Sequence, residues 1–151
     1  MSALMSGVYA ITPAAIPVAL TAVLTLAFGV RVMSRRFTIV SAAFFSMTVV
    51  VAIWMIAFTF MYSTSDAATA LRWARRAYFG VPFIAPAVYW FTVEILRIER
   101  RRGLAHVAAW TGAAFFSAIA KKTEKLIPNV QQYWWGFYPR YSPMVGAAFL
   151  L

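Results

Sequence analysis

The chain has 151 residues, of which 63% are hydrophobic and only 12% charged, whereas soluble domains are about half apolar and about a quarter charged. This composition excludes an ordinary soluble domain and predicts an integral membrane protein. The net charge of +10 does not indicate a nucleic-acid-binding protein, because the basic residues form short clusters between apolar runs, as suits the headgroups of a lipid bilayer. The absence of cysteine excludes disulfides, thiolate metal sites and cysteine nucleophiles.

Four apolar segments are long enough to cross the hydrocarbon, which takes about 20 helical residues. No Lys or Arg precedes the first of them, so we expect that span to be retained rather than cleaved as a secretory signal. The sequence thus predicts an all-α integral membrane protein with one membrane domain over residues 1–151. Its four complete transmembrane helices are expected at about 8–30, 37–62, 70–98 and 103–120.

A last apolar run begins at Met144 and predicts the start of a fifth helix. An apolar helix that ended halfway across the membrane would leave carbonyl groups unsatisfied in lipid. We therefore expect the chain to continue beyond Leu151, and any effector domain to lie outside this sequence.

The third span carries the most specific local signals. Ser65 or Asp66 can cap the start of its helix. Pro82 and Pro86 each remove a backbone hydrogen bond, so a kink is expected near the outer third of the membrane. Above that kink the sequence places Trp73 and several arginines, which either reach outer headgroups or form the basic rim of a cavity for an anionic or lipid ligand.

Orientation depends on the short loops. The 14 basic residues divide equally between the two sides of the predicted membrane domain. One half is concentrated in two tight turns, "RVMSRR" (31–36) and "RIERRR" (97–102), and the other half is spread over longer loops. The positive-inside rule weights short loops, which places these turns in the cytoplasm and the N-terminus outside.

Few residues could carry chemistry. Of the four acidic residues only Glu94 lies within a span, where an ion pair with Arg97 is favoured over a proton-relay role. His106 has no second ligand at metal-binding spacing, and an axial-ligand role toward a haem or chlorophyll is the less favoured alternative to an interfacial hydrogen bond. We therefore expect no enzymatic activity, no metal site and no cofactor.

The segment from Gln132 to Pro143, "QYWWGFYPRYSP", is half aromatic and contains two prolines and a glycine, so it cannot form a continuous helix. Trp and Tyr favour the headgroup region. We expect a turning outer loop that folds back as a lid over the ends of the spans. With the arginines of the third span, this loop forms the predicted outer ligand or partner surface: Trp73, Arg75, Arg76, Trp134, Trp135, Gly136, Tyr138, Pro139 and Arg140.

Two stretches carry a family resemblance: "LRWARRAYFGVPFIAPAVYWFTVEI" (71–95) and "KLIPNVQQYWWGFYPRYSPMVGAAFLL" (125–151). They resemble the N-terminal seven-helix membrane region of bacterial sensor histidine kinases and diguanylate cyclases, over about Leu71 to Leu151. In that family a Trp-Gly-Tyr-like motif, often followed by proline and a basic residue, precedes the fifth helix. Here Trp135 to Arg140 take those positions, and Ser142 stands where glycine is frequent.

The resemblance implies a multi-pass protein of the bacterial inner membrane that senses a ligand or relays a signal. The alternative is a non-catalytic structural subunit of a large respiratory or photosynthetic membrane complex, because apolar helices rich in Phe, Trp and Met also suit packing against other subunits. In both cases the expected partners are the lipid bilayer and other membrane helices or subunits, with no nucleic acid.

Overall fold

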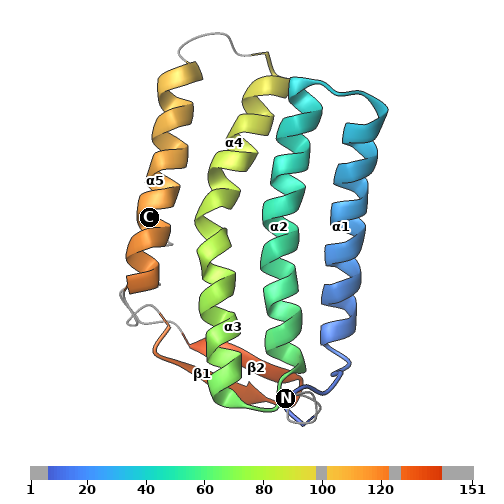
Figure 1. Ribbon diagram of the computed structural model, residues 1–151, viewed down its shortest axis with the longest axis vertical. Coiled ribbons are helices and arrows are strands. Elements are labelled where there is room, and N and C mark those ends of the chain that lie inside the picture. The colour runs from blue at the N-terminus through green and yellow to red at the C-terminus, as the bar shows by residue number, and fades with distance from the viewer. Residues whose placement is uncertain (1–6, 98–101, 123–126, 141–151) are drawn as a thin grey trace.

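The protein forms columns of helix that lie side by side, with a small β-hairpin across one end (Figure 1). The computed structural model describes residues 7–97, 102–122 and 127–140. We call the end that carries residues 7–14 and the hairpin the hairpin end, and the end with the 36–38 turn the loop end. The elements are α1 (Ala15–Arg35), α2 (Ile39–Ser63), α3 (Ala67–Gly80), η1 (Val81–Phe83), α4 (Ile84–Ile95), α5 (Arg102–Lys122), β1 (Asn129–Tyr133) and β2 (Gly136–Arg140).

The first helix begins later than the sequence predicts. α1 begins at Ala15, and the preceding segment is extended because it pairs with the end of α2. Tyr9 forms an antiparallel bridge with Thr64, and the backbone N–H of Ala10 donates to the carbonyl of Ser63 at 2.6 Å. Residues 8–14, predicted as membrane helix, therefore cross the hairpin end of the bundle.

α1 and α2 pack closely because α1 turns small residues toward its neighbour. Ala15, Ala22 and Gly29 are its buried residues and recur every seven positions. A Cβ added at Gly29 would lie 3.0 Å from the Cβ of Thr48 and would also meet its hydroxyl group, so this contact requires glycine. The other faces of α1 expose large apolar side chains, as expected of a lipid-facing helix.

The third column consists of α3, η1 and α4, which form one helical rod with an interruption at η1. Asp66 caps its start, as predicted, by accepting hydrogen bonds from the backbone N–H groups of Ala68 and Thr69. The helix is interrupted at the prolines where the sequence predicts a kink: α3 gives way to the 3-10 turn η1, which contains Pro82, and then to α4.

A neighbouring helix compensates the break. The hydroxyl group of Ser117 on α5 is buried and donates to the carbonyl of Phe79 at 3.2 Å, one residue before the end of α3. Membrane helices tolerate proline breaks where a Ser or Thr of another helix satisfies such carbonyls. α5 is therefore fixed to the rod at the position where the rod changes its geometry.

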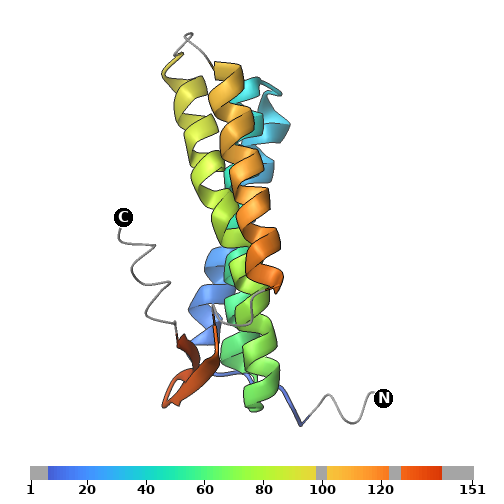
Figure 2. The ribbon, with the colours of Figure 1, turned by 90° about the vertical axis from the view of Figure 1, so that its left-hand side faces the viewer.

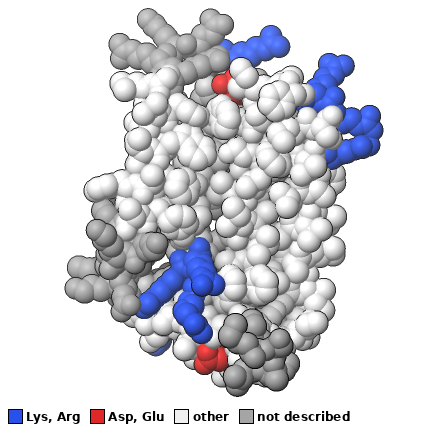
Figure 3. All heavy atoms as spheres, in the orientation of Figure 1, with Lys and Arg blue, Asp and Glu red and all other residues white. Residues whose placement is uncertain are grey.

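Three helical segments are long and apolar enough to cross a membrane: Ala15–Arg35, Ile39–Ser63 and Ala67–Ile95. The distribution of charge agrees with this assignment, since Figure 3 shows basic side chains near both ends of the visible face and an uncharged belt between them. Four complete spans were predicted. The fourth segment is helical as α5, but the side chains of 119–122 lie outside the described residues, and its crossing stays a prediction together with the fifth helix from Met144.

The aromatic loop is a β-hairpin, so the all-α prediction is wrong here. β1 and β2 pair antiparallel, with Val130 opposite Pro139 and Tyr133 opposite Gly136. Alternate residues of β2, Phe137 and Pro139, are buried, which is the two-residue period of a strand with one covered face. Strand pairing satisfies backbone N–H and C=O groups that an irregular apolar loop would leave without hydrogen bonds. Both strands are edge strands, so proline is tolerated where the backbone N–H would not point toward the partner strand.

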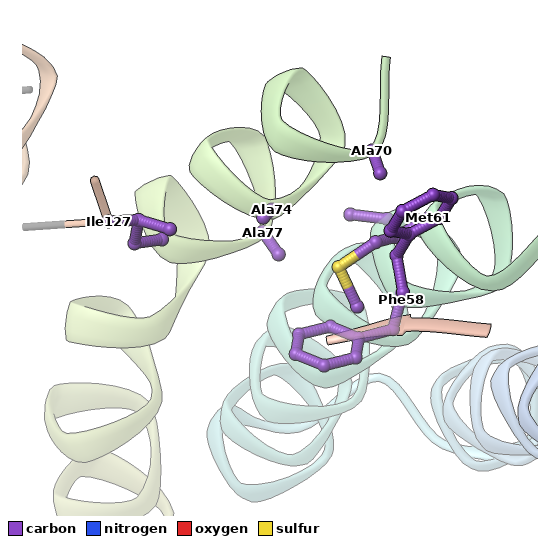
Figure 4. Close-up of a cluster of buried hydrophobic side chains, with 8 residues drawn as sticks. Phe58, Met61, Ala70, Ala74, Ala77 and Ile127 are labelled. Carbon is purple, nitrogen blue, oxygen red and sulfur yellow. The ribbon is translucent and has the colours of Figure 1, made fainter. Parts of the chain in front are cut away.

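The main hydrophobic core lies at the hairpin end rather than in the middle of the bundle. Ala70, Ala74 and Ala77 form one fully buried face of α3, and the small side chains let Met61 of α2 approach (Figure 4). Ile127 and Phe137 cover the same cluster from the segment that carries the hairpin. This core holds the N-terminal half of α3, the end of α2 and the hairpin together.

Candidate functional site

Basic side chains gather over α3 at the hairpin end, where Figure 3 shows a blue patch against an otherwise white face. α3 supplies three arginines within five positions: Arg72, Arg75 and Arg76. Arg72 and Arg76 are exposed, and Arg75 is half-buried. The alanine face of the same helix packs on α2, so the arginines lie on the other faces of α3.

Trp73 is the centre of this patch. Its ring stacks on Phe60 of α2, with centroids 4.6 Å apart and planes inclined by 17°. Its indole N–H donates to the Tyr9 hydroxyl at 2.9 Å, and the guanidinium carbon of Arg76 lies 4.7 Å from its ring centroid. Trp73 thus joins α3, α2 and the segment before α1.

A second set of contacts orders Arg72. Its guanidinium donates to the Thr69 hydroxyl at 2.8 Å, and that hydroxyl donates to the Asp66 carboxylate at 2.6 Å. The hydrogen bonds from Thr69, first from its side chain and then from its backbone, lower the pKa of Asp66, and the charge of Arg72 adds to this. Asp66 is therefore ionised at neutral pH and occupied by its role as a cap.

Between these groups lies an open pocket of about 270 Å³. One wall is the extended N-terminal segment and the other is α3. Ligand pockets are commonly about 300 Å³ or more, so this one suits a small molecule or part of a larger one. The lining residues are Val8, Tyr9, Thr69, Arg72, Trp73 and Arg76.

The hairpin packs on a different side of the same end, beside the foot of α2 and α3 (Figures 1 and 2). Trp135 meets Tyr62 of α2 edge to face at 5.4 Å and stacks on Tyr133 at 5.2 Å. Gly136 has φ 137°, and a Cβ there would lie 3.2 Å from the carbonyl oxygen of Tyr62. Trp134, its neighbour, is 95% exposed at the tip.

The predicted outer surface is thus two groups rather than one. Trp73 and Arg76 line the pocket, while Trp135, Gly136, Tyr138 and Pro139 belong to the hairpin packing. Arg140 is exposed at the end of β2, and Arg75 does not line the pocket. Of the other four lining residues, Arg72 is one of the arginines that the sequence places above the kink, whereas Val8, Tyr9 and Thr69 were missed. The spacing of Thr69, Arg72, Trp73 and Arg76 on one helical face was a usable signal for Thr69, but nothing local placed Val8 or Tyr9.

Comparison with known proteins assigns the chain to a family. Residues 17–135 match the family described as the N-terminal 7TM region of histidine kinase. The chain belongs to this family. No curated protein and no solved structure matches it. The match begins inside α1 and includes α2, both of which lie before the stretch that carries the sequence resemblance, and it ends at Trp135 in the hairpin turn.

Membership in the histidine-kinase 7TM family makes this a membrane protein of the sensory, non-catalytic part of such kinases. His106 lies on α5, half-buried, with its ring 5.4 Å from Trp90 and 6.1 Å from Trp110. Within the described ranges no three His, Cys, Asp or Glu side chains gather as metal ligands. The pocket on α3, with its arginines and Trp73, is the candidate functional site.

Proposed function

We propose that this protein is the sensory input module of a bacterial inner-membrane signalling protein, with its N-terminus and hairpin end outside and its loop end in the cytoplasm. The observation that carries the proposal is the family match over residues 17–135. The geometry adds a receiving surface: a pocket between α3 and the N-terminal segment, at the same end of the bundle as the hairpin.

The third column supplies a path between the two ends. The pocket lies on the first turns of α3, and the same rod continues through η1 and α4 to the loop end. A tilt of α3 at the pocket would be taken up at the 3-10 turn, because broken helices bend at the interruption. We propose that a ligand shifts the populations of two such tilts.

Orientation is part of the same proposal. Arg31, Arg35 and Arg36 lie around the short 36–38 turn at the loop end, which supports a cytoplasmic place for that end. The hairpin end carries several Trp and Tyr side chains, which suit a headgroup region on either side of the membrane.

A distance measurement tests the relay. The chain has no cysteine, so spin labels at Ser34→Cys and Leu96→Cys report the separation of α1 and α4 at the loop end alone. Trp73→Leu removes the stack on Phe60 and the bond to Tyr9 at the hairpin end. We expect it to shift the inter-label distance in lipid nanodiscs by about 1–2 Å, the size of typical helix shifts in signalling.

Trp134→Leu is the matched control, since it removes the same side chain type at the same end from an exposed position. We expect it to leave the distance unchanged. An unchanged distance in a folded Trp73→Leu variant would contradict the relay and favour a rigid structural role.

A further inference from the structure

The pocket on α3 offers hydrogen-bond donors and positive charge. Arg72 and Arg76 bring two guanidinium groups that remain charged at any physiological pH. The Tyr9 hydroxyl accepts from Trp73, which leaves its own proton available to donate. Among the described residues that line the pocket, none is a carboxylate. Such a set of donors fits an anion and disfavours a cation.

The contacts of the two arginines leave most of their N–H donors available to a ligand. Arg72 donates one N–H to Thr69, and Arg76 lies over the Trp73 ring. Each guanidinium has five N–H donors, so most remain open. Among the described residues neither arginine forms an ion pair with a carboxylate within 4.0 Å. The charge at the pocket is therefore not neutralised by direct pairing.

The depth of the pocket narrows the class of anion. The 29 residues of Ala67–Ile95 extend over about 44 Å, which exceeds a hydrocarbon core of about 30 Å. Arginine is costly in hydrocarbon, so the excess length belongs at the end that carries Arg72 and Arg76. The pocket then lies at the level of lipid headgroups, where phosphate is the prevailing anionic group.

We propose that this pocket binds the phosphate group of a phosphate ester, with oxygens on Arg72, Arg76 and Tyr9. Guanidinium groups match the geometry of a phosphate, and phosphate is the prevailing anion at the headgroup level. The ester can come from a phospholipid headgroup or from a water-soluble phosphate ester. The inference deepens the proposed sensory role, on which its biological meaning rests, but binding is measured here without any signalling readout.

The test is isothermal titration of the protein in dodecyl maltoside, a detergent without phosphorus. The probes are glycerol phosphate, a short-chain phosphatidylglycerol and acetate. We expect saturable binding of one or both phosphate probes and much weaker binding of acetate. Binding of the lipid alone assigns the ester to the membrane, and binding of glycerol phosphate alone assigns it to the aqueous phase. Equal binding of acetate, or binding of neither phosphate probe, would overturn the proposal.

Two variants with equal loss of charge locate the site. Arg72→Gln/Arg76→Gln should weaken phosphate binding at least about tenfold, because charge-assisted hydrogen bonds are lost. Arg35→Gln/Arg36→Gln removes the same charge at the loop end and should leave the affinity unchanged. Equal effects of the two pairs would mean that net charge, rather than the pocket, attracts the anion.

A second measurement keeps both arginines and does not depend on the folding of the variant. A spin label at the exposed residue Ala68→Cys should broaden the phosphorus resonance of the bound probe, and a label at Ser34→Cys should not. Equal broadening from both positions would overturn the assignment. If phosphate binds but the distance between the spin labels at the loop end does not shift as expected, the proposed relay alone is contradicted. If that distance shifts but no phosphate probe binds, the phosphate site alone is contradicted.

Discussion

Gly136 shows how one residue sets the position of the hairpin. A two-residue hairpin turn usually needs positive φ at its central positions, which bulky side chains resist. Here Trp134 and Trp135 form the turn, and among described non-glycine residues only Arg97 has positive φ. The positive φ instead falls on Gly136, at 137°, where an added Cβ would lie 3.2 Å from the carbonyl oxygen of Tyr62.

Gly136→Val should therefore destabilise the protein by about 1–3 kcal/mol, because valine is strained at this φ and its Cβ would contact the Tyr62 carbonyl. The measurement is the midpoint of thermal unfolding in detergent, followed by circular dichroism. Gly112→Val is the control: Gly112 is an exposed helical residue with open space around it, and the midpoint should not fall. Similar losses in both variants would show that Gly136 has no special conformational role.

Among the elements, α3 and α4 depend on α5 more than their order in the chain suggests. The proline break leaves the carbonyl of Phe79 near the end of α3, and Ser117 of α5 supplies a hydrogen-bond donor to it. The sequence predicted the break and the Asp66 cap, because both depend on residue types with strong local preferences. It could not predict Ser117, since a serine inside an apolar helix gives no sign of which backbone it meets.

Ser117→Ala should loosen the break without unfolding the bundle. Loss of an interhelical hydrogen bond in a membrane protein costs about 0.6 kcal/mol on average and about 1.7 at most. We expect faster amide hydrogen exchange at residues 79–84 and a small fall in thermal midpoint. Thr111→Ala is the matched control, because its hydroxyl bonds the carbonyl of Val107 within its own helix. If exchange at 79–84 stayed at the wild-type rate, α5 would not fix the break.

At the scale of the whole molecule, the sequence predicts local features but not the contacts between residues far apart in the chain. Spans follow from the length of local apolar runs, and three of them agree in the structure. The pocket joins Tyr9 to Trp73, 64 residues apart, through one hydrogen bond. The sequence indicates a loop rather than a hairpin at 132–143, because proline and glycine indicate turns. The alternation of buried Phe137 and Pro139 covers too few residues to predict a strand.

The orientation of the whole molecule decides which side of the membrane supplies the ligand of the pocket. Ser34 and Asn129 are exposed at opposite ends of the bundle, and no other cysteine competes for a label. With the loop end in the cytoplasm, a cysteine at Asn129 should react with an impermeant thiol reagent in intact cells, and one at Ser34 should react only after the membrane is opened. A permeant reagent should label both positions and so control for expression and access. The reverse pattern would place α3 and its arginines in the cytoplasm, where the pocket could not meet an external ligand and the phosphate would have to come from the inner leaflet or the cell interior.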